Sequence, residues 1–90
     1  SWISIRGMRP SQADRELMGL WLAQRYVHQG FNVGKLAAAL NVSHAAVGHW
    51  TRGHHQVLPK YWPAIATFFG YDAPDAILSE ARTLHRASAR

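Results

Sequence analysis

Apolar residues recur at three- and four-residue spacing along most of the chain, and this spacing predicts helices. The first predicted helix begins after Ser11 and ends near Gly30, because Ser11 and Asp14 resemble a capping box and glycine commonly follows the end of a helix. Its apolar stripe is expected to contain Leu17, Leu20, Trp21 and Val27.

Two short helices are predicted next, over residues 33–40 and 44–52, with only three residues between them. Asn32 and Ser43 stand directly before these helices, and such side chains accept hydrogen bonds from the free amides of a first turn. Asn41 suits the break because asparagine tolerates a left-handed backbone. The pattern predicts a helix-turn-helix, and an ordinary corner between two bundled helices is the alternative. The buried side is expected to contain Leu36, Ala37, Leu40, Val47 and Trp50.

Two more helices are predicted after a loop that ends at Pro59. The fourth has Pro63 in its first turn, where a missing amide hydrogen is tolerated, and ends at Gly70. The fifth begins near Pro74 and carries an apolar stripe that either packs on the core or forms the seam of a dimer. The stripe consists of Ile77, Leu78, Ala81 and Leu84. Five short helices with tight connections indicate a compact all-α domain over residues 11–90.

Residues 1–10 do not fit this helical pattern. They are expected to be either an N-terminal arm or, before Met8, a remnant of non-native residues.

The chain is basic, with a net charge of +5, and its five acidic residues all lie near the two ends. Residues 17–71 contain no acid, so this stretch is expected to attract polyanions such as nucleic acid. A solvated basic face without a partner is the alternative. The chain has no cysteine and no apolar run long enough to cross a membrane, which fits a cytoplasmic protein.

The stretch GFNVGKLAAALNVSHAAVGHWTRG resembles the phage-repressor and Cro type of helix-turn-helix, the XRE family. The positions that carry the resemblance are Gly30, Asn32, Leu36, Ala37, Ser43, Val47, Trp50 and Gly53. Further along, YWPAIATFFG is similar to the fourth helix of that family. The resemblance covers roughly residues 14 to 78 and implies a five-helix lambda-repressor-like domain that binds double-stranded DNA. The chain departs from the common family pattern at Val33, Tyr26 and Thr51, so the resemblance implies no particular DNA sequence.

A third helix lying in the major groove would turn the side opposite Val47 and Trp50 toward the base edges. The candidate base contacts are therefore His44, Ala45, Gly48 and His49. The candidate phosphate contacts are Asn32, Val33, Lys35, Ser43, Arg52, His54, His55 and Lys60. Taken singly, each of these residues is more typical of a solvated surface than of a DNA contact, and it is their grouping on an acid-free face that favours DNA. Gly48 either leaves space for a close backbone approach to DNA or simply tolerates its cost within a helix.

The histidines also raise the question of a metal site. His44 and His49 lie about 140° apart on a helix and cannot converge on one ion, and no cysteine or acid is near them in sequence. We therefore expect no metal and no cofactor. Nor does any nucleophile motif or glycine-rich phosphate loop predict an enzyme.

The expected function is a transcriptional regulator of bacterial or phage origin, acting as a repressor that binds a palindromic operator as a homodimer. Neither a small-molecule ligand nor a membrane partner is predicted. The rival hypothesis is a protein-interaction module, an antitoxin or adaptor that uses the C-terminal helix.

Overall fold

The computed structural model describes residues 11–88, which form five α-helices and one short 3-10 helix and contain no strand. In chain order the elements are α1 (Gln12–His28), α2 (Val33–Leu40), α3 (His44–Thr51), η2 (Pro59–Tyr61), α4 (Trp62–Phe69) and α5 (Pro74–Ser88). The prediction of an all-α domain is confirmed for these residues. The predicted arm, residues 1–10, lies outside the described part of the chain.

Three side chains cap the helices that the sequence predicted them to cap. Ser11, Asn32 and Ser43 each accept a hydrogen bond from the backbone amide three residues later, at 3.1, 2.9 and 3.0 Å. Each bond satisfies one of the amides that a first helical turn leaves without a partner. The starts of α1, α2 and α3 are thus set by local chemistry.

The break between α2 and α3 is a left-handed turn. Asn41 has φ 57° and ψ 44°, as the sequence predicted, and the amide of Val42 donates back to the carbonyl of Ala37 at 3.0 Å. The left-handed residue and this hydrogen bond end α2 at Leu40. Only Asn41, Val42 and Ser43 separate the two helices, so the turn decides the direction in which α3 leaves α2.

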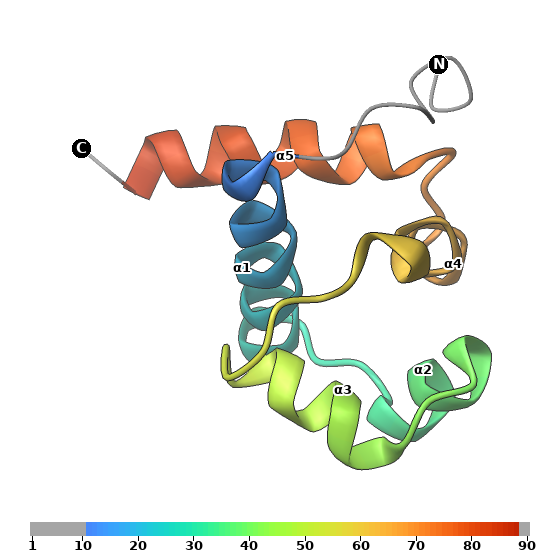
Figure 1. Cartoon of the computed structure of the whole chain (residues 1–90). Helices are drawn as coiled ribbons and strands as arrows, with labels where there is room; N and C mark the ends of the chain where they lie inside the picture. The colour runs from blue at the N-terminus through green and yellow to red at the C-terminus, as the bar shows by residue number, and fades with distance from the viewer. Residues whose placement is uncertain (1–10, 89–90) are drawn as a thin grey trace.

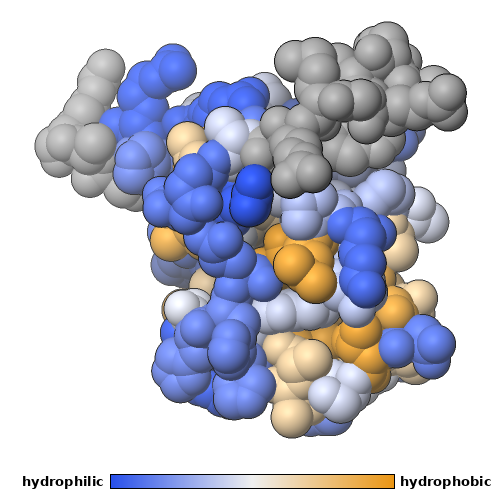
Figure 2. Space-filling model, viewed as in Figure 1, coloured by the Kyte–Doolittle hydropathy of each residue, from blue (hydrophilic) through white to orange (hydrophobic). Residues whose placement is uncertain are grey.

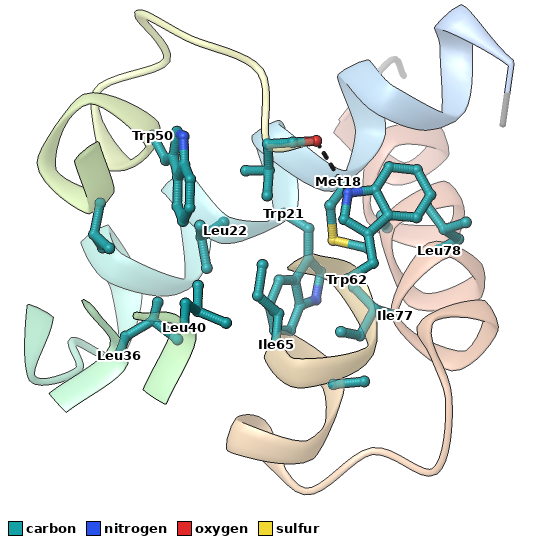
Figure 3. Close-up of a cluster of buried hydrophobic side chains, with 14 of the residues drawn as sticks. Met18, Trp21, Leu22, Leu36, Leu40, Trp50, Trp62, Ile65, Ile77 and Leu78 are labelled. Atoms are coloured by element: carbon teal, nitrogen blue, oxygen red, sulfur yellow. Dashed lines mark hydrogen bonds between the residues drawn. The ribbon is translucent and has the colours of Figure 1, made fainter. Parts of the chain in front are cut away.

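The helices enclose one core around α1. This helix packs on α5 and α3, while α2 packs on α3 and α4. In Figure 1, α5 crosses one end of α1, and α2 and α3 lie at the other. The largest fully buried side chains are Met18, Leu22, Leu36, Val47, Val57, Trp62, Ile65 and Ile77. Figure 3 shows most of this cluster, with residues from every α-helix converging on it.

The predicted stripe of α1 needs correction. Leu20 and Val27 are 42% and 72% exposed, whereas Met18, Trp21 and Leu22 are buried. The buried side is displaced because α1 packs against α5 on one side and α3 on another. The sequence shows the period of such a stripe but not which neighbours the helix meets.

Of the two roles predicted for the α5 stripe, packing on the core and a dimer seam, the structure favours the first for three of its four residues. Ile77, Leu78 and Ala81 are 0%, 4% and 4% exposed, because they pack on α1 and α4 within the same domain. A second copy of the chain therefore cannot reach them without repacking the core. Leu84, 43% exposed, is the one predicted seam residue that remains on the surface.

A polar network joins α1 to α5. The carboxylate of Glu80 accepts hydrogen bonds from Nε1 of Trp21 at 2.5 Å and from the hydroxyl of Tyr71 at 2.9 Å. Burial, and then Glu80, raise the pKa of Tyr71, while Arg25 partly opposes this. The Arg25 guanidinium lies 5.4 Å from the ring of Trp21 and 5.3 Å from that of Phe69. Arg25 is therefore held against aromatic rings beside α5.

No helix within residues 11–88 has the length and apolar character needed to cross a membrane.

Candidate nucleic-acid interface

The exposed side of α3 begins at its first turn. His44 and Ala45 are exposed, while Gly48 and His49, one turn later, are half-buried. Val47 and Trp50 point into the core, as the sequence predicted. In Figure 1, α3 forms one edge of the molecule, and Figure 2 shows hydrophilic residues gathered where α3 ends and the following loop begins. The four predicted base-contact positions therefore open to solvent more fully at the start of α3 than at its end.

The space beside Gly48 is occupied by Arg52. A Cβ atom built on Gly48 would lie 3.4 Å from Nη1 and 3.5 Å from Nη2 of Arg52. The guanidinium thus lies back along α3, one turn before its own Cα. Glycine at this position gives the guanidinium room against the helix backbone, which is a use of Gly48 that the sequence did not indicate.

Replacing Gly48 with alanine is expected to raise the free energy of unfolding by about 0.5–1 kcal/mol. Alanine favours a helix by roughly that amount over glycine, and its methyl group would meet only the mobile end of Arg52 at an ordinary contact distance. Urea denaturation followed by circular dichroism measures this change. Ala45→Gly, on the exposed side of the same helix, is the matched control and should lower the stability by a similar amount. A loss of stability in Gly48→Ala would show that the site cannot accept a methyl group.

The starts of α2 and α3 lie close together. A Cβ atom on Gly34 would be 3.3 Å from Oδ1 of Asn32 and 3.9 Å from Nδ1 of His44. The side-chain oxygens of Asn32 and Ser43 accept the capping hydrogen bonds. The side-chain N–H groups of Asn32 and the O–H group of Ser43 can still donate to a ligand outside the domain. The side chain of Val33 packs on the core, which leaves its backbone amide as the group that can hold an anion.

The cations of the acid-free stretch separate in space. Lys35 and Arg52 are exposed near α2 and α3, and Nζ of Lys60 lies 5.1 Å from the ring of Tyr61. That ring in turn lies 5.5 Å from the ring of Trp50 of α3. Arg25 belongs to the network with α5 and does not join this group.

Three imidazoles gather where α3 ends. The ring of His49 lies 5.9 Å from that of His54 and 5.0 Å from that of His55. Burial first, and then the charges of His55, Arg52 and His54, lower the pKa of His49 below its ordinary value of 6.5. We call His49, His54, His55 and Arg52 the histidine–arginine cluster. Within residues 11–88, no group of three or more histidine, cysteine or acidic side chains is arranged to hold a metal ion.

The structure adds two residues of α1 to this surface. Arg15 and Glu16 line the same surface pocket, of about 310 Å³, as His54 and His55. The stretch that lacks acids in the sequence is therefore not free of them in space. No sequence signal could have shown this, because the contact joins segments nearly forty residues apart and depends on how the loop after α3 crosses α1.

Comparison with protein families, with curated proteins and with solved structures finds no match to this chain. Its function is therefore inferred from the residues and their geometry.

Proposed function

We propose that this chain is a sequence-specific, double-stranded DNA-binding regulator of transcription, with α2 and α3 as its helix-turn-helix in a lambda-repressor-like domain. The observation that carries this proposal is the capped, three-residue break at Asn41, which leaves one side of α3 open to solvent. That side carries imidazoles and small residues, and cations lie around it. A helix with such a side fits the major groove, where bulky apolar groups would find no partner.

In this proposal the first turn of α3 reads the bases. The imidazole of His44 donates to a guanine acceptor, and the methyl group of Ala45 meets a thymine methyl. The free amides at the start of α2, including that of Val33, hold a phosphate beside Asn32 and Ser43. Further phosphates are bound by Lys35, Arg52, His54, His55 and Lys60. Binding at a promoter would exclude polymerase and so repress transcription.

We further propose that two copies bind a palindrome, because a single domain of this size covers little DNA. Three of the four residues of the α5 stripe are buried, and the fourth, Leu84, is exposed. Leu20, 42% exposed, lines a small hollow between α1 and α5 together with Leu84. These two leucines are the candidate contact between the copies.

The test is selection of bound duplexes from a random DNA pool, followed by affinity measurements across a salt series. We expect an enriched palindrome with half-sites about one helical turn apart, and affinity that falls steeply with salt because bound phosphates release counterions. Lack of enrichment, with weak and uniform binding, would refute specific DNA recognition.

A second candidate function, a protein-interaction module, is favoured by the opposite side of the domain. Leu84 and Trp21 line a surface pocket of about 440 Å³ together with Arg25 and Glu80. Two apolar side chains among polar and charged ones, with an aromatic residue and an arginine included, are compatible with a partner site. Because such a contact depends little on counterions, its affinity should change little with salt, unlike that for DNA.

A further inference from the structure

The three histidine rings at the end of α3 lie close together, with the centroids of His54 and His55 5.9 and 5.0 Å from that of His49. Nδ1 of His49 is buried and has no hydrogen-bond partner. Buried polar atoms without a partner are uncommon in folded proteins. His54 and His55 themselves are exposed and can move toward a ligand.

The charged groups around this cluster come from two elements. Arg52 of α3 lies against the helix at Gly48, and Arg15 and Glu16 of α1 line the pocket beside His54 and His55. Oε1 of Glu16 accepts a hydrogen bond from Gln12 at 3.4 Å. The cluster therefore contains more potential positive charges than negative ones, and an anion would complete it.

We propose that His49, His54, His55 and Arg52 form one phosphate-binding site that takes up a proton from solvent when a DNA backbone phosphate docks. This inference rests on the proposed DNA-binding function. It assigns these residues to the phosphate backbone, and so moves His49 from the predicted base contacts to the phosphate contacts. The proton goes to an imidazole nitrogen, and no covalent bond to the phosphate forms.

The direction of the effect follows from the charges. In the free domain, burial and the charges of His55, Arg52 and His54 lower the pKa of His49, which favours the neutral ring. A phosphate beside the cluster favours the charged ring and raises that pKa. Binding of proton and of DNA then reinforce each other, and DNA affinity increases as the pH falls between the bound and the free pKa.

The experiment measures the affinity for a duplex of about two helical turns between pH 8 and pH 6 at constant ionic strength. One coupled proton changes affinity by at most about tenfold per pH unit, so we expect roughly tenfold tighter binding at pH 6 than at pH 7.5. The pH slope should fall to less than half in His49→Gln and in the double variant His54→Gln/His55→Gln. His28→Gln, at the exposed C-terminal end of α1, is the control and should keep the full slope.

Each outcome decides between the two proposals. An unchanged slope both in His49→Gln and in the double variant would overturn proton uptake at this site while leaving DNA binding standing. The residues replaced in the double variant are exposed, so the core stays intact. A lack of duplex binding at every pH would overturn the proposed function as well. In NMR titration, the midpoint of His49 should be lowered from its ordinary value in the free protein and should rise with duplex present. A midpoint that the duplex does not move would also refute the proposal.

Discussion

Replacing Trp62 with alanine is expected to lower the free energy of unfolding by about 3–5 kcal/mol, a large share of the total stability of a small domain. Trp62 is fully buried at the start of α4, and its Nε1 donates to the carbonyl of Val57 at 3.0 Å. Figure 3 shows this bond beside Met18 and Leu78. Alanine removes the largest fully buried side chain, leaves a cavity and leaves that carbonyl without its donor.

Urea denaturation followed by circular dichroism tests this expectation. Trp62→Phe keeps most of the apolar volume but not the donor, so it should cost less than alanine, about 1–3 kcal/mol. Leu58→Ala, at a 54% exposed position next to Val57, is the control and should stay within about 0.5 kcal/mol of the wild type. A loss below about 1.5 kcal/mol in Trp62→Ala would contradict a core built around this ring.

Replacing Arg52 with alanine is expected to weaken binding to every duplex by about tenfold near 0.1 M salt. Each phosphate contact contributes about 0.9 to the slope of log affinity against log salt, so the slope should fall by about 1. The guanidinium of Arg52 lies back against Gly48, and in the proposed complex it contacts a phosphate and not a base edge. Its loss should therefore affect all sequences alike.

His44→Ala provides the contrast on the same helix. The exposed His44 stands in the first turn of α3, so its loss should reduce discrimination at one base pair by about 1–3 kcal/mol without changing the salt slope. Affinities for the selected palindrome and for single-base variants, each measured across a salt series, separate the two effects. Equal effects of both substitutions on every sequence would remove the distinction between base-reading and phosphate-binding residues.

The placement of the candidate interface shows where reasoning from the sequence was sufficient. Asn32 and Ser43 cap α2 and α3, and Asn41 adopts the left-handed turn, as their residue types predicted. These features depend on contacts between residues three or four apart, so side-chain chemistry and backbone sterics decide them. For the same reason, the inward positions of Val47 and Trp50 could be predicted from helical periodicity.

Other parts of the site depended on contacts that join distant segments. Arg25 belongs to the acid-free stretch but stacks on Trp21 and Phe69, away from the candidate interface. Glu16 lies outside that stretch yet lines a pocket with His54 and His55. The distribution of charges along the sequence therefore predicted some residues of the interface but not all of them. It included Arg25, which lies elsewhere, and missed Glu16.

The sequence by itself determined the helices, their capped ends, the break before α3 and the inward side of α3, because each is a local property of a few neighbouring residues. Only the tertiary structure decided which face of α1 is buried, that the α5 stripe belongs to the core, and that three histidine rings meet beside Arg52. Helical periodicity shows that a face is apolar but not what covers it. The packing of α1 against α3 and α5 determines which side chains are covered.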